Sequence, residues 1–151
     1  MNTLVKRQSG KRGNAVLEFA LTWALTSILF TSVFQYGWSM FIYNELMTSV
    51  TNGAIYASTL KYDSQSSSAY TTAVQNMVVY GDPTGTNTIP LVPNLATTNV
   101  SVDTHNSGLY PTDVTVSINS FMVDAVFGKQ TFTGKPRMTV KFIGMAVCTG
   151  C

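Results

Sequence analysis

The chain has 151 residues, of which 45% are hydrophobic and 11% charged, and its formal net charge is +2. Residues 1–13 carry four Lys and Arg and no acid, whereas residues 14–151 carry five bases and seven acids, a net charge of −2. A nucleic-acid-binding protein needs a basic face on its folded part, and this distribution excludes one. The sequence also lacks a nucleophile–His–acid set, paired catalytic carboxylates and a phosphate-binding loop. We therefore expect no catalytic residues, no cofactor and no small-molecule substrate.

A basic leader at residues 1–13 precedes a long apolar segment. From Phe19 to Tyr43 the chain runs 25 residues without a charged side chain. A helix of that length can cross the roughly 30 Å hydrocarbon core of a bilayer. Lys and Arg clustered on one flank favour keeping that flank in the cytoplasm. The sequence thus predicts a single-pass membrane protein with a cytoplasmic N-terminus and an extracytoplasmic C-terminal domain in contact with membrane lipid.

One helix is predicted over residues 14–60. After Tyr43 its pattern becomes amphipathic, with apolar residues recurring at steps of three and four. At 1.5 Å per residue the helix would be roughly 70 Å long, with Gly37 and Gly53 as its weak or close-packing points. Aromatic residues near the end of the apolar segment suit an interfacial belt. The belt comprises Phe34, Tyr36, Trp38, Phe41 and Tyr43.

Residues 61–151 are predicted to form one small α+β domain. A second helix is expected from Ser68 to Tyr80, since Gly81 is a suitable residue just past a helix end and Pro83 prevents continuation. A loop rich in Gly, Pro, Thr and Asn follows, up to about residue 98.

Beyond this loop the apolar pattern takes a period of two, which predicts a small antiparallel sheet. A turn at His105–Gly108 would join the first two strands. The last two strands would form a meander through Gly134–Pro136. Residues 121–126 fit a single helical turn, and the apolar phase of the last strand slips, which predicts a bulge near Gly144. The expected strands cover residues 100–102, 114–118, 130–133 and 137–147. The expected fold class is α+β: a long N-terminal transmembrane helix, a second helix and a small antiparallel sheet.

The stretch from Gly13 to Leu21, GNAVLEFAL, resembles the start of TadE-like proteins, the minor pseudopilins of tight-adherence (Flp-type) pilus systems. In type IV pilin-like precursors a short basic leader ends in Gly, and Glu stands five residues into the mature chain. Gly13 and Glu18 reproduce that spacing. Residues 53–57, GAIYA, are similar to the Gly-Ala-Arg-Tyr-Ala sequence of the family, with Ile55 in place of its arginine. The proline that many members carry shortly after Glu-Phe is absent.

The resemblance implies a pilin-like fold and cleavage by prepilin peptidase between Gly13 and Asn14. It implies that Glu18, followed by Phe19, then pairs with the Asn14 amine of a neighbouring subunit during assembly. The implied partners are the peptidase, other pilus or pseudopilin subunits and an inner-membrane assembly platform. The implied location is the bacterial inner membrane with a periplasmic C-terminal domain, with entry into a surface pilus left open. Alternatively, Glu18 lies at the membrane interface, where a carboxylate costs less than at the bilayer centre, and has no role.

Two cysteines, Cys148 and Cys151, fit an oxidising compartment. A zinc site needs further ligands, and His105 is the only histidine, so we expect no metal. A thioredoxin-like redox pair needs a helix N-terminus after its first cysteine, which we do not expect here. A turn with Gly150 at its third position would bring the two cysteines within disulfide distance. The pattern favours a terminal disulfide, with free or intermolecular thiols as the alternative.

Three functions follow from these features. The first is a structural role as a TadE-like minor pseudopilin in assembly or secretion of an adhesive pilus. The second is an unprocessed, membrane-anchored extracytoplasmic domain for binding or adhesion. The third, an extracytoplasmic thiol enzyme, rests only on the two cysteines.

Overall fold

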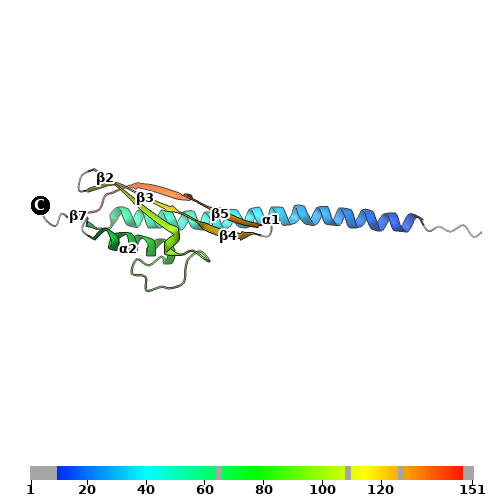
Figure 1. Ribbon diagram of the computed structural model, residues 1–151, viewed down its shortest axis with the longest axis horizontal. Helices are drawn as coiled ribbons and strands as arrows, with labels where there is room; N and C mark the ends of the chain where they lie inside the picture. The colour runs from blue at the N-terminus through cyan, green and yellow to red at the C-terminus, as the bar shows by residue number, and fades with distance from the viewer. Residues whose placement is uncertain (1–9, 64–65, 108–109, 126–127, 148–151) are drawn as a thin grey trace, which may run out of the picture. The chain divides into compact units, whose positions relative to one another are not determined.

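The computed structural model of the chain describes residues 10–63, 66–107, 110–125 and 128–147 (Figure 1). Its layout is α+β, with a long apolar N-terminal helix, a second helix and short strands in small sheets. The chain divides into two compact units, Met1–Trp38 and Ser39–Cys151. Cys148 and Cys151 lie outside the described residues, so their pairing stays a prediction.

The first helix, α1, runs continuously through Gly10–Thr59. It begins four residues before the predicted start and ends one residue before the predicted end, and Gly37 does not interrupt it. In the first unit every residue from Gly13 to Phe30 is exposed. In the second unit α1 buries one face, because apolar residues recur there at helical spacing. The buried side chains of that face are Ile42, Leu46, Val50, Ala54 and Ala57.

The second helix, α2, spans Ser67–Tyr80 and packs against α1 in the core of the second unit. Gly53 of α1 is the point of close approach, since a Cβ atom at this position would collide with the side chain of Val78. Gly81 ends α2 with a positive φ of 69°, and its amide donates to the carbonyl of Met77 at 3.0 Å. This left-handed cap confirms the predicted helix end, because glycine adopts positive φ without a Cβ clash.

The largest sheet has three antiparallel strands in the order β2-β3-β6. Val116 of the central strand lies opposite Val102 on one side and Met138 on the other. Alternate residues of the central strand, Val114, Val116 and Ile118, are fully buried in the same core as α1 and α2. The strands are β2 (Val100–Ser107), β3 (Tyr110–Ile118) and β6 (Arg137–Lys141), and a short 3-10 helix, η2 (Thr97–Asn99), precedes them.

The predicted helical turn over residues 121–126 is wrong. Phe121–Ala125 forms strand β4, which pairs antiparallel with β5 (Gly128–Phe132). Phe121 and Val123 are buried while Met122 between them is exposed, so the true period is two. The predicted meander is also wrong, because β5 pairs with β4, whereas β6 pairs with β3.

The last predicted strand, over residues 137–147, is interrupted rather than bulged. β6 ends at Lys141, and the amides of Ile143 and Gly144 donate to the carbonyl of Ser58 at 2.9 and 2.8 Å. The chain then forms β7 (Ala146–Val147), which pairs in parallel with β1 (Tyr62–Asp63). Gly144 is required at this crossing because a Cβ there would lie 2.7 Å from the carbonyl oxygen of Leu60.

Candidate functional site

The residues predicted to govern processing and assembly lie in one stretch of α1. Gly13, Asn14, Glu18 and Phe19 are all helical and exposed. The ring of Phe19 stacks on that of Trp23, with centroids 6.2 Å apart and an interplanar angle of 21°. Glu18 is therefore placed on a helix surface that is otherwise uncharged from Gly13 to Tyr43, within reach of any helix or lipid that packs there.

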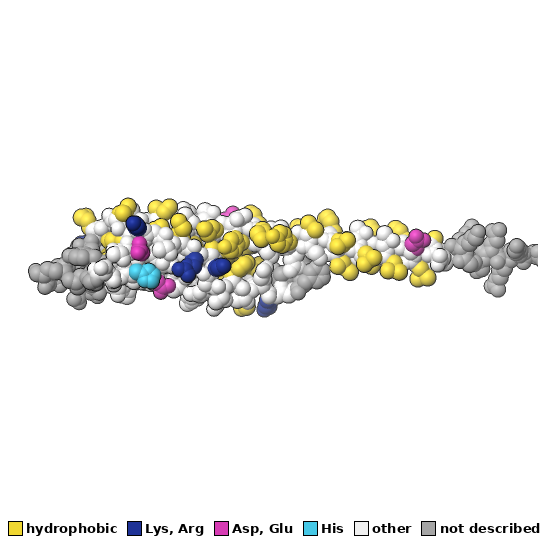
Figure 2. Space-filling model, turned by 90° about the horizontal axis from the view of Figure 1, so that it is seen from above, with side chains coloured by type: hydrophobic (Ala, Val, Ile, Leu, Met, Phe, Trp, Pro, Cys, Tyr) yellow, Lys and Arg dark blue, Asp and Glu magenta, His cyan; other side chains and the backbone are white. Residues whose placement is uncertain are grey.

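The apolar surface around Glu18 is extensive. The large apolar side chains from Val16 to Phe34 are each 55–75% exposed. Among the described residues, α1 is the one helix long and apolar enough to cross a membrane. Figure 2 shows hydrophobic side chains along the exposed part of this helix. Such a surface is stable only when lipid or other apolar helices surround it.

Four hydroxyl groups of this segment are satisfied within the helix. Each of the four donates to the carbonyl oxygen four residues earlier at 2.8–2.9 Å, so these donors need no further partner in an apolar medium. The residues that do so are Thr22, Thr26, Thr31 and Ser32.

The second unit carries a polar face on its three-stranded sheet, on the side opposite the buried valines. The strand register places polar side chains in three rows across this face, because alternate residues of a strand point the same way. The rows are Ser101–Ser117–Arg137, Asp103–Thr115–Thr139 and His105–Asp113–Lys141. Figure 2 shows the histidine near acidic and basic side chains. The predicted turn at His105–Gly108 is thus wrong at its start, since His105 lies within β2 opposite Asp113.

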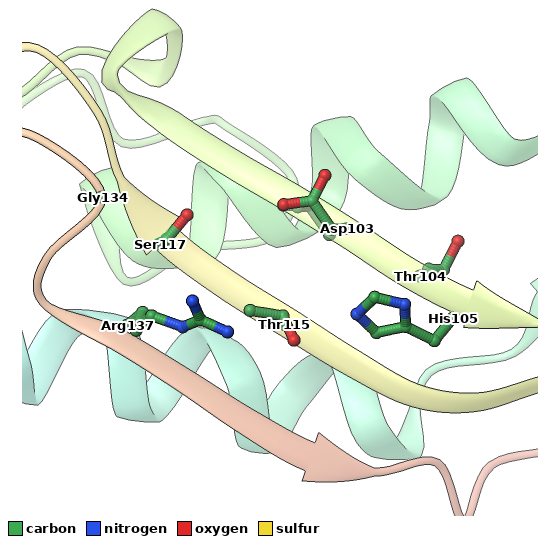
Figure 3. A pocket seen from close by; sticks show the side chains of 8 residues that line it. Asp103, Thr104, His105, Thr115, Ser117, Gly134 and Arg137 are labelled. Carbon is green, nitrogen blue, oxygen red and sulfur yellow. The ribbon is translucent and has the colours of Figure 1, made fainter.

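A depression of about 640 Å³ opens on this face (Figure 3). Thr115 and Ser117 of the central strand form its floor, and they are only 5% and 8% exposed. Asp103 borders it from β2 and Arg137 from β6. The remaining lining residues are Val102, Thr104, His105 and Gly134.

Hydrogen bonds hold part of this depression in place. The hydroxyls of Thr115 and Thr139 lie 2.8 Å apart, and the Ser101 hydroxyl donates to Asp103 Oδ2 at 3.3 Å. The amide of Gly134 donates to Asn119 Oδ1 at 3.0 Å, which fixes the loop at the rim. Two other cavities, of about 300 and 340 Å³, are smaller and lie elsewhere on the unit.

Among the described residues of the second unit, two titratable groups have shifted pKa values. Burial, with a smaller contribution from Tyr62, raises the pKa of Tyr70 to about 12. Hydrogen bonds from the side chain and backbone of Thr84 hold the pKa of Asp82 below its usual value, aided by the amides of Asn87 and Thr86. Both groups make hydrogen bonds to the backbone, Tyr70 to the carbonyl oxygen of Ala57 and Asp82 from the amides of the loop after α2. No group of three or more metal-ligating side chains occurs in the part of the chain that the structure describes.

Comparison with protein families, curated proteins and solved structures finds no match to this chain. The polar face was not predicted from the sequence, although polar residues at every second position of β2, β3 and β6 were its signal. These residues become one site only when the order of the strands is known.

Proposed function

We propose that the chain is a membrane-anchored structural subunit, a pilin-like minor pseudopilin of the TadE-like kind. The observation that carries this proposal is the change of environment along α1. Its N-terminal part exposes apolar side chains on every side, whereas its C-terminal part, from Ile42 onward, is a core element of a folded domain. A single helix of this kind both anchors a domain and offers a long surface for packing between subunits.

The resemblance supplies the mechanism within this proposal. Prepilin peptidase cleaves after Gly13 in the inner membrane, and the new amine of Asn14 becomes available to a neighbouring subunit. Glu18 pairs with that amine, because a carboxylate in an apolar medium gains most from an opposite charge. Other pilus subunits and an assembly platform complete the machine, and the second unit faces the periplasm.

A second candidate function is an unprocessed, membrane-anchored binding domain. It is favoured by the polar depression between β2 and β6, which packing between subunits does not require. In this alternative α1 is only an anchor, and Glu18 has no partner.

The substitution Glu18→Gln separates the two functions, because it removes the charge while keeping shape and hydrogen bonding. We expect the variant to reach the membrane at normal levels, checked by immunoblot, and to fail to support surface piliation, counted by electron microscopy. Glu45→Gln is the matched control, since it removes another exposed acid from the same helix beyond the uncharged stretch. Normal piliation with Glu18→Gln at normal levels would favour the anchored binding domain.

The mature N-terminus provides an independent test. Mass spectrometry of membrane-extracted protein should show a chain that begins at Asn14 when the peptidase is active. A chain that retains its leader under the same conditions would contradict the pseudopilin proposal.

A further inference from the structure

From the depression on the outer face of the β2-β3-β6 sheet we infer a binding site for an acidic sugar, a saccharide unit that carries a carboxylate. The inference concerns the second unit alone and does not depend on pilus assembly. It adds a ligand that the sequence did not lead us to expect.

Opposite charges border the depression on its two sides. Asp103 and Arg137 stand on opposite outer strands with β3 between them (Figure 3). Strands lie about 4.8 Å apart in a sheet, so the two backbones are separated by roughly twice that distance. Within the part of the chain that the structure describes, no ion pair joins the two side chains. Both charges therefore remain available to a ligand that spans the depression.

Ser117 brings a hydroxyl group to the floor of the depression. This side chain is 8% exposed, and within the described ranges its hydroxyl has no hydrogen-bond partner. No fully enclosed side-chain nitrogen or oxygen atom lacks a partner in these same ranges. The Ser117 hydroxyl must therefore open onto the depression that it lines, where it can donate to or accept from a ligand.

The lining of the depression is mostly polar. Apart from Val102 and Gly134, the lining residues carry polar side chains, so the depression does not suit a lipid tail or an aromatic ligand. Its volume of about 640 Å³ falls in the range of small-ligand sites. A floor of two hydroxyl groups matches a ligand that is itself rich in hydroxyl groups.

A sugar with a carboxylate fits both ends of this arrangement. The guanidinium group of Arg137 can bind the sugar carboxylate through two parallel hydrogen bonds. Asp103 accepts hydrogen bonds from hydroxyl groups at the other end of the ring, and Ser117 contacts the ring between them. A neutral sugar would leave Arg137 without its partner and should bind more weakly.

The test uses the full chain in phosphatidylcholine nanodiscs, which contain no sugar headgroups. The two probes are methyl β-glucuronide and methyl β-glucoside, which differ only in a carboxylate in place of a hydroxymethyl group. Binding is measured by titration with amide chemical shifts as the readout. We expect the glucuronide to bind at least about tenfold more tightly than the glucoside, with the largest shifts at Thr115, Ser117 and Arg137.

Matched variants assign the site. Arg137→Gln should abolish the preference for the glucuronide, whereas Lys141→Gln, which removes a base from the same strand outside the depression, should preserve it. Asp103→Asn should weaken binding of both sugars roughly tenfold. Asp113→Asn is its control and should have little effect.

Three outcomes would overturn the proposal. The first is equal affinity for the two sugars, and the second is no binding of either sugar. The third is an equal loss of the preference for the glucuronide in Arg137→Gln and Lys141→Gln, which would indicate a general charge effect. Thermal unfolding of each variant shows whether the fold is intact, and Ser117→Ala, a small change on the floor, gives a second measure of weakened binding. Since the assay scores binding by one protein, its failure would leave the assembly proposal unaffected.

Discussion

The phenol group of Tyr70 in α2 donates a 2.6 Å hydrogen bond to the carbonyl oxygen of Ala57 in the last turn of α1. Carbonyls in the last turn of a helix have no partner within the helix and need one from elsewhere. The next carbonyl, that of Ser58, accepts from the amides of Ile143 and Gly144. Two segments distant in sequence thus complete the end of α1 and join it to the rest of the second unit.

Tyr70→Phe removes the first of these bonds and leaves the buried Ala57 carbonyl unsatisfied. We expect the free energy of unfolding of the second unit to fall by about 1–3 kcal/mol. Thermal unfolding of the full chain in detergent, followed by circular dichroism, measures the loss. Tyr80→Phe is the control, since its phenol group makes no hydrogen bond within the described residues. Equal effects of the two substitutions would show that the Ala57 bond contributes nothing.

Alkaline pH should weaken the same contact. The pKa of Tyr70 is raised from 10.0 to about 12 in the folded chain, mainly by burial. As the pH rises above 10 the unfolded chain loses this proton first, so the free energy of unfolding falls until the pH reaches about 12. Tyr70→Phe lacks the titrating group. The stability difference between the wild-type chain and the variant should therefore narrow between pH 10 and about pH 12, the window set by these two values. A stability difference that stays constant over this pH range would show that Tyr70 is not the titrating group.

Gly53→Ala should destabilise the second unit although alanine favours helices. The added methyl group would collide with the fully buried side chain of Val78. Overpacking of this kind costs about 1–3 kcal/mol, which exceeds the roughly 1 kcal/mol gained in helix propensity. Gly37→Ala is the matched control on the same helix, because, apart from its chain neighbours and the nearby backbone of α1, no atom lies within 4 Å of a Cβ there.

A double variant tests the cause. Val78→Ala should make room for the new methyl group, so the two substitutions together should cost less than the sum of their separate effects. The free energies of unfolding of the wild type, Gly53→Ala, Val78→Ala and the double variant are compared in detergent. Simple additivity would mean that Val78 is not the obstacle.

Asp82→Ala should loosen the loop that follows α2. The Asp82 carboxylate accepts from the amides of Thr84, Thr86 and Asn87 at 3.0–3.3 Å. Hydrogen exchange at these three amides should accelerate in the variant, while exchange in α2 is unchanged. Asp124→Ala, at another exposed acid, should leave all of them protected.

Acid should have the same effect on this loop in the wild-type chain. The pKa of Asp82 lies below 3.8 in the folded state, because the hydrogen bonds from Thr84 favour the charged form. The bonds are therefore kept above pH 3.8 and lost as the pH falls through the lower folded value. If these amides are no longer protected from hydrogen exchange at pH 5, roughly a unit above this range, the Asp82 carboxylate is not the source of their protection.

Both helices could be predicted because their signals are local. The amphipathic spacing of α1 and the Gly81 cap of α2 depend only on neighbouring residues. The pairing of strands could not be predicted, since Phe121–Ala125 is too short an apolar run to distinguish a strand from a helical turn. Strand β7 pairs with β1, which lies at the other end of the domain's sequence, and no local pattern predicts such a contact.

The candidate sites likewise divide into one that a local signal predicts and one that depends on contacts between distant segments. Gly13 and Glu18 were identified by their spacing along one segment, whereas the depression needs Asp103 and Arg137 from strands that are far apart in sequence. A polar residue at every second position signals only an exposed face. Such a face becomes a candidate site only when the order of the strands places Ser117 between Asp103 and Arg137.

The uncharged stretch of α1 is longer than a bilayer requires. Its 25 residues from Phe19 to Tyr43 form about 38 Å of helix, roughly 8 Å more than the hydrocarbon core. The last five of these residues, Ser39–Tyr43, belong to the second unit, where Ile42 is buried in the core. The 20 residues that remain, from Phe19 to Trp38, form about 30 Å of helix, which equals the thickness of the hydrocarbon core. In a bilayer, Glu18 at one end and the folded unit at the other would therefore leave the helix little freedom to move along the membrane normal.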